Sequence, residues 1–330
     1  MTAAEISHEY PLAKQLDSEL WSENFALAMS DTINEISMLY SIGTWYDDTS
    51  IWREKLSIQM PDGHILIGRN YGRNTGGSVV SGALSRYEII EHEKQVRMQW
   101  NGPVWSHSFD ELMTRGFNGG LARNLNLDVH FEATTPIWDM KKDGQKDKTG
   151  ITGAMHTEQL GRCHGSLRYN GQNWAISKAL SCRDHSRGKR DFAPYKTHCW
   201  INGEFENGRA FQLYAAEIYG LDGPALSSAT VIEDGVHYPA TITHVEFISG
   251  HDDYRKRQTI GLESAIGKMQ IEVTRVRSCL PVSVVTPFEA QAGIIKDRDY
   301  GLIFDETVDL LWNGHTGLGW SERGWSKKLG

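Results

Sequence analysis

The chain has 330 residues, of which 39% are hydrophobic and 23% charged, so it is able to bury a core and is not a disordered protein. Its formal net charge of −8 argues against binding to nucleic acid duplexes, which requires clustered Lys and Arg. There is no run of about 18 apolar residues and no signal-peptide pattern, so we expect no membrane span and a cytoplasmic location.

Glycine and aromatic residues are abundant, with 33 Gly, 11 Trp, 12 Tyr and 10 Phe against 9 Pro. This composition suits strands joined by tight turns, but aromatic side chains also line ligand cavities. The four cysteines show no CxxC spacing, which favours reduced thiols over disulfides or a zinc site.

The first half of the chain contains several alternating segments. A helix is expected near Leu16–Met29 and one helical turn near Asp110–Met113. The turn Pro61–Gly63 separates two alternating segments and predicts a hairpin. Alternation in Val96–Trp100 and Leu125–Phe131 predicts half-buried strands.

The second half continues this pattern. Asn170-Gly171 and Asn202-Gly203 predict hairpin turns, because a type I′ turn needs positive φ at both central residues. The charged segment Lys141–Gly150 predicts an exposed connection between domains. The predicted fold is mainly β, with antiparallel β-barrel domains at residues 1–145 and 146–330, because a closed barrel removes exposed sheet edges.

The densest group of polar residues is the segment Arg183–Asp191, with the sequence RDHSRGKRD. It follows the predicted strand Trp174–Ala179 and falls in the second predicted domain. One interpretation is structural, with Asp184 paired to Arg183 or Arg190 to hold a loop. We expect the rigid guanidinium fork of Arg190, together with Asp191, to have such a structural role.

The other interpretation is catalytic. Asp184 is the first candidate, because a carboxyl group at an apolar cavity mouth is able to donate a proton. His185 is the second candidate, because imidazole titrates near neutral pH. Glu158 and Glu322 are candidate partners from other strands.

Other kinds of catalysis find less support. His156, His164, His198 and His244 show no HxH or HxxxH spacing, so we expect no metal site. No Gly-rich phosphate loop and no GxSxG motif are present, so we expect neither a nucleotide cofactor nor a serine nucleophile.

The motif and its surroundings resemble the superfamily of lipocalin-like carotenoid hydratases and AttH-like proteins. The resemblance is carried by these parts of the sequence: His156–Gln159, Gly165–Leu167, Asn170-Gly171, Arg183–Ser186, Gly188, Arg190-Asp191 and the C-terminal Gly317–Glu322. One departure is Arg187, which stands where the superfamily usually has Trp. The resemblance implies two lipocalin-like barrels, a ligand cavity, and chemistry without an organic cofactor, as in hydratases of isoprenoid double bonds and cyclases of polyenes.

The sequence therefore predicts a cofactor-independent lyase or isomerase, of the hydratase, dehydratase or C–C cleaving type. The expected partner is a hydrophobic small molecule such as a terpenoid, steroid or aromatic compound, and a homodimer is left open. Charged and aromatic side chains near the motifs are expected to bind this substrate: Arg183, Trp320, Trp174, His164 and Tyr169. The alternatives are a cyclase that acts through cavity shape and a non-catalytic carrier of lipophilic ligands.

Overall fold

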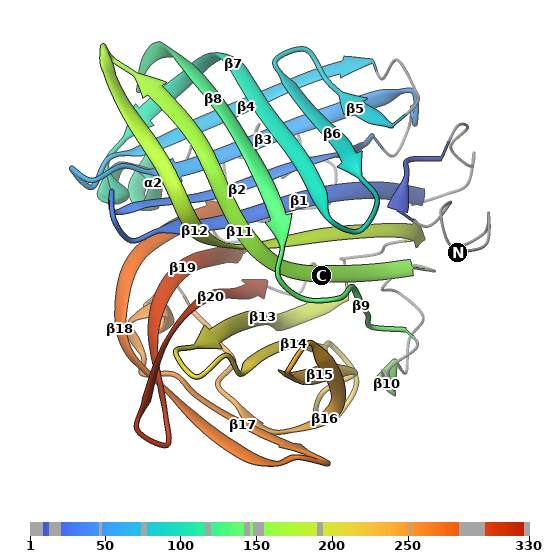
Figure 1. Cartoon of the computed structure of the whole chain (residues 1–330). Coiled ribbons are helices and arrows are strands. Elements are labelled where there is room, and N and C mark those ends of the chain that lie inside the picture. Colours follow the sequence, from blue (N-terminus) through green and yellow to red (C-terminus); the bar gives the residue numbers. More distant parts are fainter. Residues whose placement is uncertain are drawn as a thin grey trace. The chain divides into compact units, whose positions relative to one another are not determined.

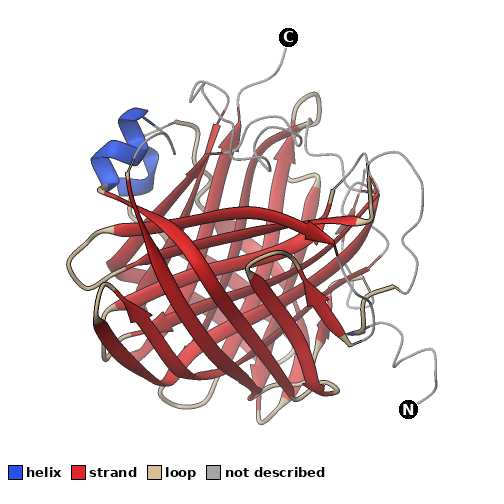
Figure 2. Cartoon of the chain, turned by 90° about the horizontal axis from the view of Figure 1, so that it is seen from above, coloured by secondary structure: helices blue, strands red, loops and turns tan. Residues whose placement is uncertain are grey.

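The structure is a computed structural model of the chain. It describes residues 9–12, 21–45, 48–73, 78–115, 120–141, 146–147, 155–189, 194–250, 252–283 and 301–326. Strands make up almost all of the described secondary structure (Figure 2), which confirms the mainly β prediction. None of the helices within these ranges is long and apolar enough to cross a membrane.

The first of two compact units combines residues 1–137 and 153–190. Eight of its strands pair antiparallel in a ring that returns to its start, in the order β1-β2-β3-β4-β7-β8-β11-β12 (Figure 1). The ring strands are β1 (Trp21–Asp31), β2 (Ile36–Thr44), β3 (Ile51–Gln59), β4 (Ile65–Arg73), β7 (Gln95–His107), β8 (Leu121–Ala133), β11 (Met155–Tyr169) and β12 (Gln172–Lys189). The unit also contains β5 (Val79–Ser81), β6 (Ser85–Glu91) and α2 (Phe109–Arg115).

The second unit combines residues 138–152 and 191–330. Eight of its strands also close into an antiparallel ring, in the order β13-β14-β15-β16-β17-β18-β19-β20. They are β13 (Tyr195–Phe205), β14 (Ala210–Ile218), β15 (Leu226–Glu233), β16 (Val236–Val245), β17 (Thr259–Ser264), β18 (Gly267–Ser283), β19 (Gly301–Trp312) and β20 (His315–Ser326). The remaining elements are β9 (Trp138–Asp139), β10 (Lys146–Asp147) and the 3-10 helix η1 (Asp253–Arg255).

The division between the units differs from the predicted boundary at residue 145. Residues 155–189 form β11 and β12, which pair with β8 and β1 and therefore complete the first barrel. The segment Arg183–Lys189 of the RDHSRGKRD motif thus belongs to the first unit and not to a C-terminal domain. It also lies within a strand, where the sequence suggested a loop.

The predicted helix at Leu16–Met29 is wrong where the structure describes it, because Trp21–Asp31 is strand β1. Its Ala, Leu and Met residues have good helix propensity, but pairing with β2 and β12 overrides that weak local preference. The helical turn near Asp110–Met113 is confirmed as α2. Ser108 and Glu111 form a capping box there, each side chain bonding to the other's backbone N–H.

Two of the three predicted turns are confirmed. Pro61–Gly63 joins β3 to β4, and Asn170-Gly171 joins β11 to β12 with φ of 49° and 78°, as a type I′ turn requires. Asn202-Gly203 was predicted as a turn, but it lies inside β13. A Cβ on Gly203 would lie 2.4 Å from Leu310, so close packing, and not a turn, requires glycine there.

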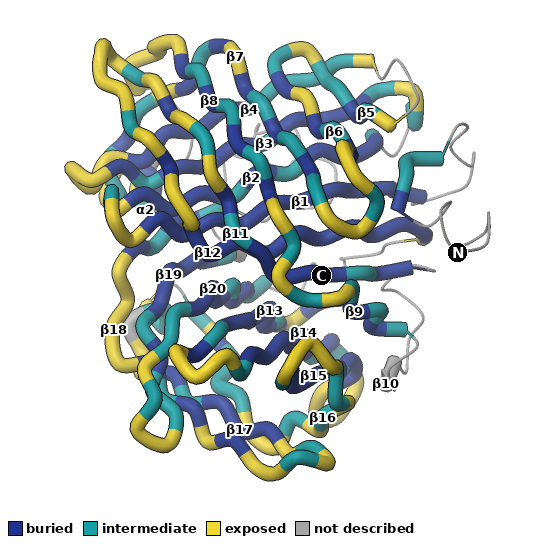
Figure 3. The backbone as a smooth tube through the Cα atoms, in the orientation of Figure 1, coloured by how far each residue is buried: buried dark blue, intermediate teal, exposed yellow. Residues whose placement is uncertain are grey.

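Burial along the strands shows which parts of the first barrel are unusual. In β8 the alternate residues Leu125, Leu127, Val129 and Phe131 point into the core, and the residues between them are half-buried. In contrast, β1 is buried at every position and is dark blue throughout in Figure 3. Residues 179–188 of β12 are likewise all buried. The polar residues of the motif therefore lie on two buried faces of one strand.

Candidate active site

The β11–β12 hairpin separates the motif residues between its two faces. His185 pairs in register with Phe25 of β1, which belongs to the core of the first barrel. Because successive strand residues point to opposite faces, Arg183, His185 and Arg187 point toward the barrel interior. Asp184 therefore points away from the core, on the outer face of the hairpin.

On this outer face, three titratable side chains meet. His156 and Glu158 are two residues apart on β11, and Glu158 is the direct cross-strand partner of Asp184. His156 Nε2 lies 2.5 Å from Asp184 Oδ2 and 3.6 Å from Glu158 Oε1. All three side chains are buried. We call this group the His156 triad (His156, Glu158 and Asp184), and it is able to share and transfer protons within itself.

The His156 triad is also a group that could hold a metal ion, since its ligand atoms lie within 4.8 Å of one another. The sequence predicted no metal site. Two ligands of one tetrahedral zinc ion, each about 2.0–2.2 Å from it, stand more than about 3 Å apart. The contact of 2.5 Å between His156 and Asp184 is shorter than that and suits a shared proton better.

A second group lies on the interior face of the hairpin. His185 Nε2 lies 2.9 Å from Glu23 Oε1, and Arg187 Nη1 lies 3.5 Å from the same oxygen. The imidazole stacks on Phe25 at 3.9 Å between ring centroids. His185 Nδ1 is buried and has no hydrogen-bond partner among the described residues.

Burial is the main cause that lowers the pKa of His185, although the bond to Glu23 opposes it. A neutral ring donates its one N–H from Nε2 to Glu23 and leaves Nδ1 as an acceptor. Burial also lowers the pKa of Arg187. His185 is therefore a second candidate base, on the face opposite to Asp184.

The lowered pKa of His185 predicts a pH dependence of stability. The unfolded chain takes up the proton near pH 6.5 and the folded chain only below that, so the free energy of unfolding should fall as the pH drops below about 6.5. Burial also lowers the pKa of His107, so this residue adds to the same fall in stability at low pH. His185→Gln should make this dependence shallower in urea unfolding between pH 7 and pH 5 (about the imidazole range). His64→Gln, the same substitution at an exposed residue beside Asp62, is the control.

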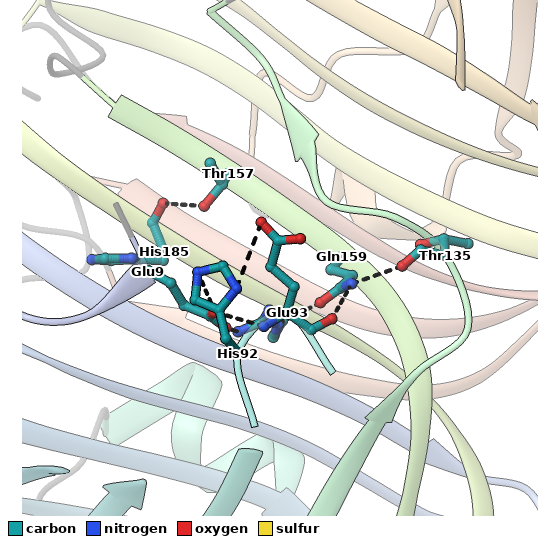
Figure 4. A network of polar contacts seen from close by, with 8 residues as sticks. Glu9, His92, Glu93, Thr135, Thr157, Gln159 and His185 are labelled. Carbon is teal, nitrogen blue, oxygen red and sulfur yellow. Dashed lines mark hydrogen bonds and ion pairs between the residues drawn. The ribbon is translucent and has the colours of Figure 1, made fainter. Parts of the chain in front are cut away.

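A further interior network surrounds Arg183. Its guanidinium contacts Glu9 Oε1 at 2.5 Å and donates to Gln159 Oε1 at 2.7 Å. Glu9 also accepts a bond from the Glu93 backbone N–H and lies beside His92, as Figure 4 shows. These contacts link the β11–β12 hairpin to Glu9 and to the turn before β7. Arg183 is therefore part of a structural network of the first barrel.

The remaining predicted site residues lie elsewhere. Glu322 and Trp320 are on β20 of the second unit, where Glu322 pairs with His198 at 2.8 Å. Tyr169 and Trp174 flank the Asn170-Gly171 turn and pack against the first core. His164 is exposed and stacks on His130. Arg190 and Asp191 lie outside the described residues.

The sequence did not reveal that His156 contacts Asp184, that Glu23 contacts His185, or that Glu9 contacts Arg183. The spacing of His156 and Glu158 carried a signal, since residues two apart on a strand share a face. Glu23 lay within the segment predicted as a helix, so its pairing with His185 could not be foreseen.

Two closed antiparallel barrels in one chain define a two-barrel, lipocalin-like β protein. The sequence model described as "Domain of unknown function (DUF7064)" matches residues 5–327, and the chain belongs to this family. A search of curated proteins finds no match.

Three solved structures share the fold over nearly the whole chain. A putative AttH (NE1406) from Nitrosomonas europaea is 10% identical with a TM-score of 0.61, over 93% of this chain and 92% of that one. CghA is 9% identical with a TM-score of 0.58, and the match covers 97% of this chain and 94% of CghA. Kievitone hydratase from Nectria haematococca is 11% identical with a TM-score of 0.57, and the match covers 98% of this chain and 92% of the hydratase. The resemblance to AttH-like proteins is thus confirmed for the fold.

Proposed function

We propose that this chain is a cofactor-independent enzyme that acts on a hydrophobic small molecule by acid–base chemistry. The reaction would be that of a hydratase, a dehydratase or another lyase, or that of an isomerase. The observation that carries this proposal is the buried His156 triad, in which one imidazole contacts two carboxyl groups from neighbouring strands. The likeness in fold to kievitone hydratase supports a hydratase-type reaction.

The triad offers the groups that addition or removal of water requires. One group must give a proton to the leaving hydroxyl or to the double bond, and another must take a proton from water or from carbon. In our proposal, written for dehydration, Asp184 donates a proton to the leaving hydroxyl, which departs as water, and His156 takes a proton from the neighbouring carbon. That proton then returns to Asp184 through the direct contact of the two side chains. Glu158 is the second acceptor and faces the same Nε2 atom of His156 at 3.6 Å.

This proposal predicts that turnover persists after exhaustive chelation and without added nicotinamide, flavin or ATP. The reason is the contact between His156 and Asp184, which is shorter than two ligands of one ion allow. The measurement is mass spectrometry of prenylated phenols, terpenoids and steroids incubated with the purified chain, looking for gain or loss of one water. Activity that is lost on chelation and restored by zinc or iron would show that the triad is a metal site.

A further inference from the structure

Two histidines lie opposite each other on the outer face of the first barrel. His130 of β8 and His164 of β11 are direct cross-strand partners, and the two strands lie side by side (Figure 1). Their sequence neighbours Val129 and Cys163 belong to the core of this barrel, so both imidazoles point to the outer face. His164 is exposed and His130 is half-buried. We call these two residues the histidine pair.

The two imidazoles have nearly the spacing of two ligands of one metal ion. Their ring centroids are 5.4 Å apart, and their planes differ by 14°. Two imidazole nitrogens bound at about 2.0 Å to one tetrahedral ion place their ring centroids about 5 Å apart. Because both side chains reach the surface of the barrel, their rings need only a small rotation to bind one ion together.

Nitrogen atoms of both rings are available for such an ion. Within the part of the chain that the structure describes, neither imidazole makes a hydrogen bond to the protein. The charged group beside the pair is Asp128, whose Oδ1 lies 3.8 Å from His130 Nε2. Arg97 holds this carboxylate with two hydrogen bonds. An imidazole that binds a metal through one nitrogen commonly has a carboxylate beside the other nitrogen, so Asp128 suits a metal site.

The backbone around His164 directs this residue toward His130. The register between β11 and β12 shifts between Cys163 and Gly165, so His164 has a directly opposed residue only on β8. Gly165 follows with φ of 150°, and a Cβ at this position would lie 2.1 Å from the carbonyl oxygen of Asp128. Glycine therefore lets β11 approach β8 closely, directly beside the histidine pair.

We propose that the histidine pair binds a divalent transition-metal ion, with one nitrogen from each ring and the remaining positions open to water or another ligand. Imidazole suits Cu²⁺, Ni²⁺ and Zn²⁺, and nitrogen ligands bind Cu²⁺ most tightly of these. No HxH or HxxxH spacing indicates this site, because strand pairing brings the two histidines together. The site is separate from the His156 triad and does not depend on the acid–base function proposed above.

The experiment is a calorimetric titration of the full chain with Cu²⁺, after chelation and removal of the chelator. His130→Gln and His164→Gln should each raise the Kd of the tightest site at least about 10-fold, since even residues that only orient a metal ligand change affinity about 10- to 100-fold. The double variant should lose little more than either single variant, because one ion needs both rings. Without metal, these surface substitutions should leave the melting temperature unchanged.

A spectroscopic measurement counts the ligands directly. With one equivalent of Cu²⁺, pulsed electron paramagnetic resonance should detect two imidazole nitrogens in the unaltered chain and one in His164→Gln. The matched control is His315→Gln. His315 lies 3.8 Å from Glu206, as His130 lies from Asp128, but its cross-strand partner is Trp312 and not a second histidine. This variant should change neither the Kd nor the spectrum.

Three results would overturn the inference: a Kd for Cu²⁺ that neither single variant changes, losses that simply add in the double variant, or a spectrum of the unaltered chain with only one imidazole. Additive losses would mean that each histidine binds its own ion. Turnover is not measured in this experiment, so its outcome is independent of the test of Asp184. A histidine pair that binds no ion would leave the proposed acid–base function as it stands.

Discussion

Replacing Asp184 with asparagine should lower turnover about 10²- to 10⁴-fold, the usual contribution of general acid–base catalysis. Asparagine keeps the volume of aspartate and is able to hydrogen bond to His156, but it cannot give up or take up the proton. The Kd of the substrate and the melting temperature should change little. The measurement is single-turnover kinetics beside a thermal melt of the same variant.

The chain offers a matched control for this variant. Asp128 also lies near a histidine, with Oδ1 3.8 Å from His130 Nε2, but its side chain is 37% exposed and is held by Arg97. Asp128→Asn should leave turnover unchanged. If Asp184→Asn lowers the melting temperature strongly and activity only in proportion, Asp184 is structural.

Two further outcomes separate the alternatives that the sequence left open. Full turnover by Asp184→Asn would favour a cyclase, in which the shape of the site holds the substrate in a reactive conformation and proton transfer matters little. Binding of hydrophobic compounds without turnover of any of them would favour a carrier.

The sequence predicted most of the fold because its signals are local. Alternation in Leu125–Phe131 and the Asn170-Gly171 turn each need only a few neighbouring residues. The prediction failed at Trp21–Met29, where burial on both faces of β1 hides the alternation. It failed also at Asn202-Gly203, where the glycine serves packing against a strand distant in sequence.

The candidate site could be predicted only in part. The sequence pointed to Asp184, Glu158 and His185, but it placed Asp184 and His185 together because they are adjacent. In a strand, adjacent residues point to opposite faces, so the structure separates these two. Only the register between β11 and β12 brings His156 to Asp184, and register depends on long-range pairing that single residues do not reveal.

A large effect on stability is expected at Glu9, which contacts the buried guanidinium of Arg183. Glu9→Gln preserves shape but leaves Arg183 as a buried charge without this carboxylate. Breaking one side of a buried ion pair costs about 3–5 kcal/mol. The midpoint of urea unfolding of the first unit should therefore fall clearly, with the slope of the transition unchanged.

Glu93→Gln is the control for Glu9→Gln, because Glu93 also lies beside His92, but at 4.0 Å and with 48% of its side chain exposed. An exposed pair of this kind contributes about 0–1 kcal/mol, so the midpoint should hardly move. The double variant Glu9→Leu with Arg183→Met should recover most of the lost stability, since apolar groups often replace a buried pair without cost. If the double variant is as unstable as the sum of its single variants, the two residues stabilise the barrel through separate contacts, and the pairing of Glu9 with Arg183 contributes nothing of its own.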